Sequence, residues 1–591
     1  MSNEEPVRLK KALNTWQIFF ISFSGIFGTG FLFAILSGAA YAGPAILISW
    51  IIAGAFFIIF GIVFTELGTM FPFSGSLVRY HIFSHGSAGN FQIGWAYLVG
   101  AIAGPPVEVV GMITLASAFA PYLYNSTLGI LTLPGIALAI GLMGFFALVQ
   151  YIGVNVYGNI NSGLTILKVG VIVLMILLGL VLIFKPENLY GLTGHFSPYG
   201  YGTVFSALVV TGIVYSYTGF RQGLDFAGEA KNPSKSLPVA TIWAVVVSMV
   251  LYILLQIVFI GGINWSAAGV AVGNWSGLYS SHWSANPFYY EFIASRINLL
   301  IGFALIIVAI AIISPFTAMG VYSGTAARSV YGFSKSSYLP SVLGKVDKRF
   351  RTPGVAILVM FIVGVMFLLP FPSWYLLVGI TSSFGVYSYM QAGITAAVLR
   401  KVKPNFPRIF KTPVPSVIFP ISFVLASMLV YWTGWNIVRD LVFIVDGGLP
   451  LFLMAAKGRD VFRLKLAESS TFSAVYWIVL AIDAVIAMLK PSEFFVYWAI
   501  LSILTIGGYF YLYNHSKYSK EARALSWTVI YNVLLMIVSY FGSLGKNVLQ
   551  EPWDYLVFLV ISIGMYYYIV RIGFETEELK QFEKNEFKVT E

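Results

Sequence analysis

The stretch Gly25-Ile26-Phe27-Gly28-Thr29-Gly30 interrupts the first apolar segment of the chain, which runs from about residue 17 to residue 36. A segment of this length crosses a bilayer, but three glycines and a threonine within six residues disfavour a continuous helix. In lipid, an unwound backbone is tolerated only where protein or a water-filled cavity surrounds it. Broken helices of this kind present amide and carbonyl groups to a small charged solute. The stretch therefore predicts a transporter with a binding site near the middle of the membrane.

The composition is that of a multi-pass membrane protein. Of 591 residues, 58% are hydrophobic and only 10% are charged, which excludes an ordinary soluble domain. The net charge of +11 does not indicate a nucleic-acid partner, because the Lys and Arg residues lie in short loops between apolar spans. Cysteine is absent, so disulfides and thiol chemistry are excluded. No metal or other cofactor is expected. The first span has no small-residue cleavage site and is expected to be retained.

Apolar segments long enough to cross a bilayer recur along the whole chain, and we expect about 14–16 spans. The segment near 437–456 is the least regular, because Asp446-Gly447-Gly448 interrupts it. The segments fall near 17–36, 43–70, 91–123, 131–152, 162–184, 203–227, 239–262, 297–327, 354–371, 374–399, 414–434, 437–456, 472–489, 493–513, 525–545 and 553–573.

Positive charge alternates between the loops. Lys and Arg gather before the first span and after the sixth, eighth, tenth, twelfth and fourteenth spans, which predicts a plasma-membrane protein with both termini cytoplasmic if the span number is even. The expected divisions are a cytoplasmic tail at 1–14, a transport core of ten spans at 15–400, flanking spans at 401–456, additional C-terminal spans at 457–573 and a cytoplasmic tail at 574–591.

A second interruption matches the first. The sixth span is broken at Thr218-Gly219-Phe220-Arg221-Gln222-Gly223, five spans after the first break. The two halves would then have opposite orientations in the membrane. Paired interruptions at corresponding positions indicate an inverted-repeat transporter and locate its binding site.

At these residues the chain resembles the permeases of the amino acid–polyamine–organocation superfamily, over roughly residues 15–435. The resemblance implies an all-α fold of five plus five inverted helices with broken helices 1 and 6, two flanking helices and extra C-terminal helices. Residues after about 457 resemble the longer tail of some members. The matching motifs, in order, are Gly25 to Gly30, Ala42-Gly43-Pro44-Ala45, Glu66-Leu67 with Met70-Phe71-Pro72 and Ser74-Gly75-Ser76, Tyr217-Thr218-Gly219-Phe220, Gly228-Glu229-Ala230-Lys231-Asn232-Pro233 with Leu237-Pro238, and Arg328 to Pro340 with Thr352-Pro353.

The substrate site is expected between the two breaks. In the family, the substrate carboxylate lies against amides of the first break, and free amides at the start of a half-helix favour an anion on physical grounds as well. The substrate ammonium would meet carbonyl oxygens of the second break. Alternatively, the glycines only allow close helix packing. The candidate residues are Ile26, Gly28, Thr29 and Gly30 for the first break and Tyr215, Tyr217, Thr218 and Gly219 for the second.

Lys168 is a candidate for proton coupling, because it lies inside an apolar span and ionisable groups there are usually functional. It matches a lysine that proton-coupled members carry on the fifth helix. The resemblance places Gly25, Ser314 and Thr317 around it. The alternative is a lysine that extends from near the end of its span to the membrane surface.

Arg221 departs from the family, in which an acidic residue is common at this position. Glu108 lies on the part of the third span that lines the family's pocket. Buried unpaired charges are costly, so these two residues are expected to pair, as a gate, a specificity element or a static contact. Asp225, one helical turn from Arg221, is a third possible partner. In a different interpretation, Arg221 contacts an acidic or bulky polar substrate directly.

Glu66 and Glu229 lie near the cytoplasmic ends of the second and sixth spans, where family members close the inner gate. We expect them to act as gating residues, with Arg79 or Lys231 nearby as partners. Surface pairs of this kind are individually weak.

The sequence therefore favours a secondary active transporter that imports an amino acid or related amine, with protons as the second partner. The alternatives are an exchanger of amine solutes and a transporter-like receptor that binds without accumulating its ligand. No Walker-type phosphate loop is present, and no enzyme is indicated because no nucleophile–base pair is visible. The substrate side chain and the oligomeric state are not indicated by the sequence.

Overall fold

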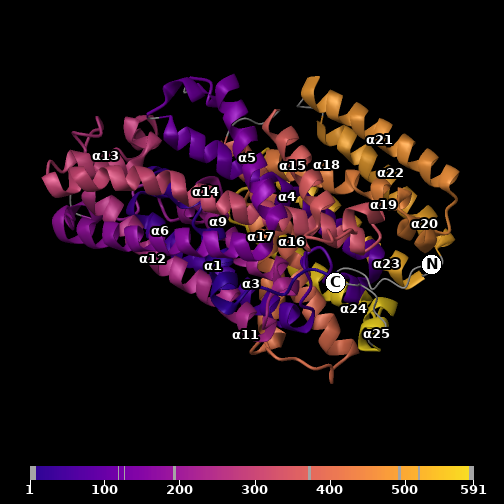
Figure 1. Ribbon diagram of the computed structural model, residues 1–591. Coiled ribbons are helices and arrows are strands. Elements are labelled where there is room, and N and C mark those ends of the chain that lie inside the picture. Colours follow the sequence, from indigo (N-terminus) through magenta and orange to yellow (C-terminus); the bar gives the residue numbers. More distant parts are fainter. Residues whose placement is uncertain are drawn as a thin grey trace.

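In the computed structural model the chain is almost entirely helical, with helices packed side by side (Figure 1). The structure describes residues 8–117, 119–125, 127–190, 195–369, 374–489, 494–516 and 519–584. The ends of both predicted tails, residues 1–7 and 585–591, therefore lie outside the described residues. Within them, the only sheet is one antiparallel pair, β1 (Tyr124–Asn125) and β2 (Ile130–Leu131).

The N-terminal half contains the helices that carry the predicted site. They are α1 (Thr15–Ile26), α2 (Gly30–Ala42), α3 (Ile46–Met70), α4 (Ile82–Ala116), α5 (Leu133–Ile152), α6 (Val154–Leu182), α7 (Glu187–Tyr190), α8 (Gly202–Val210), α9 (Ile213–Tyr217), α10 (Gln222–Asp225), α11 (Pro233–Pro238), α12 (Ala244–Gly262), α13 (Pro287–Ala294) and α14 (Asn298–Lys335).

The remaining helices include those after residue 457 that the sequence assigns to additional spans. They are α15 (Gly354–Leu368), α16 (Trp374–Val402), α17 (Pro415–Tyr431), α18 (Trp435–Gly447), α19 (Leu449–Met454), α20 (Ala456–Phe462), α21 (Leu466–Leu489), α22 (Phe494–His515), α23 (Ser519–Phe541), α24 (Trp553–Ile572) and α25 (Glu577–Glu583).

Short tighter or wider turns connect several of these helices. They are η1 (Gly43–Ala45), η2 (Pro121–Leu123), η3 (Thr218–Arg221), η4 (Ala227–Glu229), the π-turn η5 (Val239–Trp243), η6 (Trp275–Ser280), η7 (His282–Ala285) and η8 (Ser341–Gly344).

The chain is a multi-pass membrane protein. Its described part contains nine helical segments long and apolar enough to cross a bilayer, or eleven if two bent pairs each count as one span. Thr15–Met70 counts there as one segment although it holds two of the predicted spans, and α15 is shorter than a full span. The predicted number of 14–16 spans, the five-plus-five repeat and the domain limits stay predictions.

The first predicted break is present. A capping box at Asn14, in which Asn14 and Gln17 each accept the other's amide, starts α1. The helix then ends at Ile26 and α2 begins at Gly30. Three residues, Phe27 to Thr29, therefore lie outside helical structure in the middle of an otherwise buried segment.

The second predicted break is also present, and a further interruption precedes it. At Thr218 to Arg221 the α-helix gives way to the 3-10 turn η3, as expected. The sharper change of direction comes earlier, because the axis bends by 60° between α8 and α9. Gly212 lies at this bend with φ of 87°, a left-handed conformation that glycine adopts without strain. The sixth segment is thus interrupted twice.

The C-terminal helices pack against the core rather than apart from it. Helix α23 lies on α4, and α24 lies on α17. Tyr387 of α16 donates a 2.8 Å hydrogen bond to Asn532 of α23, and Tyr431 of α17 donates one of 2.8 Å to Asp554 of α24. Helices α21 and α22 lie farther out, at one edge of the molecule (Figure 1).

Candidate functional site

Only some of the backbone amides and carbonyls of the first break form hydrogen bonds within their own chain segment. The amide of Gly28 reaches back to the carbonyl of Ile26 at 3.1 Å. That carbonyl also accepts a 2.7 Å hydrogen bond from the hydroxyl of Tyr252 on α12. Side chains of other helices bind further groups of this break, as an unwound segment in a membrane requires.

Glu108 of α4 supplies the acceptor for one amide of this break, that of Thr29. Its Oε2 accepts a 2.8 Å hydrogen bond from the amide of Thr29, and its Oε1 accepts one of 2.7 Å from the hydroxyl of Tyr215. The side chain is fully buried. A Cβ atom at Gly28 would collide with this carboxylate, so the glycine allows the close approach. A carboxylate at the start of a half-helix is electrostatically favourable.

Lys168 of α6 lies on the opposite, carbonyl side of the same break. Its Nζ donates to the carbonyl of Phe27 at 2.8 Å, to Ser24 Oγ at 3.0 Å and to Thr317 Oγ1 at 2.9 Å. Ser314 donates to the Phe27 carbonyl as well, at 2.6 Å. The ammonium is fully buried and enclosed by these acceptors, so it does not extend to a membrane surface.

Gly25 lies beside this group. Its carbonyl accepts a 3.3 Å hydrogen bond from the hydroxyl of Tyr322 on α14. The backbone of Gly25 is packed against Gly219 of the second break so closely that a Cβ atom at Gly219 would overlap it. The structure thus brings Lys168, Gly25, Ser314 and Thr317 together around the first break, as the resemblance implies.

The second break packs directly against the first. The hydroxyl of Thr218 donates to the carbonyl of Tyr215 at 2.8 Å and lies 3.2 Å from the hydroxyl of Tyr322. A Cβ atom at Gly30 would meet Tyr215 and Ser216. Tyr217 turns away, because its hydroxyl donates to the carbonyl of Trp50 on α3 at 3.1 Å.

Arg221 does not pair with Glu108, and that prediction is wrong. None of the three guanidinium nitrogens has a hydrogen-bond partner among the described residues. The group instead lies 4.5 Å from the centre of the Tyr97 ring and 5.8 Å from that of Tyr389, where ring faces attract a cation. Glu108 is held by the amide of Thr29 and by Tyr215 instead.

Asp225 also makes no hydrogen bond with Arg221. The hydroxyl of Tyr97 donates to Asp225, so the tyrosine lies between the two charges with its ring against the arginine. Arg221, Tyr97 and Asp225 are all fully buried. Arg221 is therefore a buried cation that lies against aromatic rings and near a carboxyl group. Its N–H groups are donors that the described residues do not use.

The two predicted gating residues are held by arginines from distant parts of the sequence. Arg400, at the end of α16, donates two hydrogen bonds of 2.9 and 2.7 Å to Glu66, and the amide of Thr412 adds one of 2.7 Å. Arg408 lies 3.4 Å from the same carboxylate. The sequence analysis had suggested Arg79 or Lys231 as partners of the two glutamates.

Glu229 forms a buried bidentate ion pair with Arg328 of α14, with one hydrogen bond of 2.9 Å. Its backbone carbonyl accepts the amides of Ala12 and Leu13, both at 3.0 Å. The segment before α1 is thereby attached to η4, which follows the second break. Because Glu229 and Arg328 are fully buried, this is not the weak surface pair that was expected.

Several aromatic residues of the site were missed by the sequence analysis. Tyr252 and Tyr322 donate to the first break, and Trp374 of α16 donates from its indole nitrogen to Thr29 Oγ1 at 2.9 Å. The chain has 35 tyrosines and 14 tryptophans, mostly in apolar spans. An aromatic side chain with one polar atom is therefore common in these helices, and that property did not distinguish Tyr252, Tyr322 and Trp374 from the other tyrosines and tryptophans.

Comparison with known proteins gives a consistent result. The sequence profile of a family described as "Amino acid permease" matches residues 13–445. The glutamate/serine transporter AimA of Bacillus subtilis is 30% identical, over 97% of this chain and 96% of its own length. The aspartate-proton symporter of the same organism is 26% identical, over 95% of this chain and 97% of its own length. The branched-chain amino acid permease BcaP is 26% identical, over 76% of this chain and 94% of its own length.

Proposed function

The chain belongs to the amino acid permease family, within the amino acid–polyamine–organocation superfamily, and from this premise we propose that it is a proton-coupled importer of amino acids. The substrate would bind between the two broken segments, which would act as the central helices of a five-plus-five inverted repeat. Both termini would lie in the cytoplasm, and the plasma membrane would be its location.

One observation carries the proposal: the first break is held by a cation on its carbonyl side and a carboxylate on its amide side. Lys168 donates to the carbonyl of Phe27, and Glu108 accepts from the amide of Thr29. These are the two kinds of contact that an amino acid makes through its ammonium and carboxylate. The substrate carboxylate would take the place of Glu108 on the amides around Gly28 and Gly30.

This exchange provides a physical basis for proton coupling. Two carboxylates in one buried site repel each other strongly, so a substrate carboxylate enters more readily when Glu108 is protonated. Lys168 adjoins the same break and is a second group that can release or bind a proton. Movement of substrate and proton together is therefore favoured over movement of either alone. Exchange without net proton movement is the alternative.

Arg221 supports an acidic substrate. Its buried guanidinium has donors that the described residues do not use, and a carboxylate is the group that such a planar donor binds best. Two relatives that match nearly the whole chain are named for glutamate and serine and for aspartate. We propose that the side-chain carboxylate of glutamate or aspartate contacts Arg221.

Alternating access would require the ion pairs at Glu66 and Glu229 to open. Both link helices from different parts of the chain, α3 to α16 and η4 to α14. Their joint presence would keep one end of the pathway closed while the other is open, which is the gating role expected from the family.

The decisive experiment is uptake into proteoliposomes that contain the purified chain. Labelled glutamate, aspartate, serine, leucine and lysine would each be supplied with and without an inward pH gradient. Proton-driven accumulation of glutamate or aspartate above equilibrium is the expected result. Counterflow without gradient-driven accumulation would identify an exchanger, and saturable binding without any uptake would identify a receptor.

A further inference from the structure

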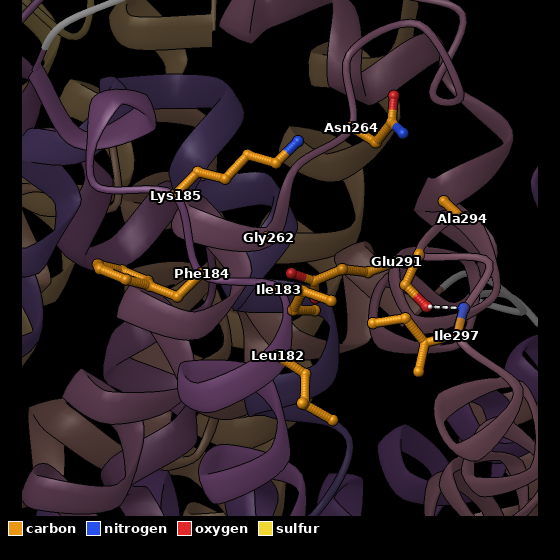
Figure 2. A pocket seen from close by; sticks show the side chains of 10 residues that line it. Leu182, Ile183, Phe184, Lys185, Gly262, Asn264, Glu291, Ala294 and Ile297 are labelled. Atoms are coloured by element: carbon orange, nitrogen blue, oxygen red, sulfur yellow. Dashed lines mark hydrogen bonds between the residues drawn. The ribbon is translucent and has the colours of Figure 1, made fainter.

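A cavity of about 320 Å³ lies away from the broken helices, where α6 and α12 end and α14 begins. Its wall is formed by residues 182–185 at the end of α6, by Gly262 and Asn264 at the end of α12, and by the segment from Glu291 in α13 to Ile297. Figure 2 shows that side chains from these three parts of the chain surround one space. The volume is in the range of small-molecule sites.

The walls of this cavity are fixed by hydrogen bonds between its elements. The amide of Lys185 donates to the carbonyl of Gly261 at 2.9 Å. The side-chain amide of Asn188 donates to the carbonyls of Gly261 and Ile263 at 3.0 and 3.1 Å. The end of α6 and the end of α12 are thus attached to each other, so the cavity is part of the folded structure.

Glu291 brings a buried carboxyl group without a hydrogen-bond partner to this cavity. Its side chain is 1% exposed, and neither carboxylate oxygen has a hydrogen-bond partner among the described residues. Oε1 lies against Gly262, where a Cβ atom would collide with it. Burial raises the pKa of Glu291 well above its usual range. Burial alone therefore favours the neutral acid, and a bound cation would favour the ionised carboxylate.

Lys185 and Asn264 bring donors to the same cavity. The Lys185 side chain is exposed and forms no ion pair with Glu291 in the described structure, although both line the space (Figure 2). Asn264 uses its Oδ1 to accept from Ser266 Oγ and from the amide of Ala267, at 2.9 and 3.2 Å. That arrangement leaves Nδ2 as a donor.

The combination selects between ligand classes. A simple cation would be attracted by Glu291 but repelled by Lys185. A simple anion would be attracted by Lys185 but repelled by Glu291. A molecule with an ammonium and an anionic group a few bonds apart satisfies both. We propose that this cavity binds a primary-amine zwitterion, with its ammonium at Glu291 and its anionic group at Lys185 and Asn264 Nδ2.

Two sources provide this chemistry. One is a free amino acid, and the other is the head group of phosphatidylethanolamine, since the cavity lies at the ends of membrane-crossing helices. The apolar wall formed by Leu182, Ile183 and Ile297 accommodates the hydrocarbon part of either. The inference is separate from the proposed transport site, because no residue is shared between the two.

The test uses the full-length chain in nanodiscs, with Glu291→Gln and Lys185→Gln as variants. Glu187→Gln is the matched control, since Glu187 is exposed and does not line the cavity. One arm measures molecules of labelled L-serine bound per chain in discs of phosphatidylcholine and phosphatidylglycerol. The other arm uses native mass spectrometry to measure retained phosphatidylethanolamine, with phosphatidylcholine as the probe that has the same phosphate but no N–H donors.

Loss of one bound L-serine per chain in both cavity variants would support the amino acid source. A loss of retained phosphatidylethanolamine, with phosphatidylcholine unaffected, would support the lipid source. In either arm the affinity is expected to fall about tenfold or more, the usual effect of removing a charge-assisted hydrogen bond. If Glu291→Gln fails to fold, the exposed Lys185→Gln variant gives the same answer. Wild-type binding by Lys185→Gln in both arms would overturn the proposal.

Discussion

The carboxylate of Glu108 accepts a 2.8 Å hydrogen bond from the amide of Thr29, at the point where the first helical segment is unwound. An internal carboxylate therefore occupies one of the amides that we assign to the carboxylate of the substrate. Loading the site then requires this contact to break, and the protonation state of Glu108 determines how easily that happens.

Glu108→Gln should imitate the protonated acid. The amide side chain still reaches Thr29 but carries no charge, so substrate binding should lose most of its dependence on pH. Accumulation driven by a pH gradient should fall at least tenfold while counterflow persists. Gradient-driven uptake and counterflow would both be measured in proteoliposomes, with Glu187→Gln as the control variant. Unchanged gradient-driven accumulation by Glu108→Gln would contradict this role.

Gly28→Val should abolish substrate binding. A side chain at this position collides with the Glu108 carboxylate and closes the approach to the amides. Gly163→Val on α6 is the matched control, because no atom lies within 4 Å of a Cβ atom there. Equilibrium binding of a labelled substrate to monodisperse protein is the measurement. If a well-folded Gly28→Val protein binds normally, the site lies elsewhere.

Lys168→Met should lose uphill accumulation and retain insertion into the membrane. Methionine fills the space but cannot donate to Phe27, Ser24 or Thr317, and it carries no proton. Lys168→Arg should not restore coupling, because arginine does not release a proton at any relevant pH. The measurement is substrate accumulation at several imposed pH gradients. Full accumulation by either variant would limit Lys168 to a structural role.

Arg221→Gln should shift preference away from acidic substrates. Losing a charge-assisted contact of about 1.5–3 kcal/mol weakens glutamate binding roughly 10–100-fold, while leucine or serine binding changes little. Competition assays against one labelled substrate give the ratio. An equal loss for acidic and neutral amino acids would show that Arg221 supports the fold rather than selecting the substrate.

The same residue allows a second measurement with Glu108. Because the two side chains share no hydrogen bond, a double-mutant cycle of Arg221→Gln and Glu108→Gln on serine binding should be additive within about 0.5 kcal/mol. A larger coupling energy would show that the two charges interact after all.

The buried pair of Glu229 and Arg328 should be the most sensitive to single neutralisation. Glu229→Gln or Arg328→Gln leaves one uncompensated buried charge, at a cost of about 3–5 kcal/mol in unfolding free energy. The double variant should recover much of this loss. Thermal unfolding in one detergent compares the three, with the exposed pair Glu577 and Lys580 as a control in which no measurable change is expected. A double variant as unstable as the sum of the singles would rule out direct pairing.

The sequence was sufficient for features that depend on local pattern. The apolar spans, the glycine-rich break at Gly28 and the lysine in α6 all follow from composition and spacing, and the structure places Lys168 against that break. What it did not provide are contacts between distant segments. Arg400 and Glu66 are separated by 334 residues, and no local pattern links them.

The partner of Arg221 shows why charge alone is a weak guide. The buried arginine was assigned to Glu108, a carboxylate expected in the same region. Two aromatic faces attract it instead, and Glu108 accepts from Thr29 and Tyr215. The bend at Gly212 was missed for a related reason. The chain has 57 glycines, and the sequence alone does not show which of them adopts a left-handed conformation at a bend.

Helix α4 crosses the membrane almost without a lipid-facing side. Helices α14, α16 and α23 surround it, and it contains buried polar residues that lipid would not accept. Asn90 donates to the carbonyl of Val78 at 2.9 Å, and His85 contacts the carbonyl of Ile569 at 3.1 Å. The expectation that a membrane-crossing helix presents apolar side chains to lipid therefore does not apply to α4. A change in bilayer thickness therefore reaches Glu108 only through neighbouring protein, chiefly α14 and α16, which pack along α4.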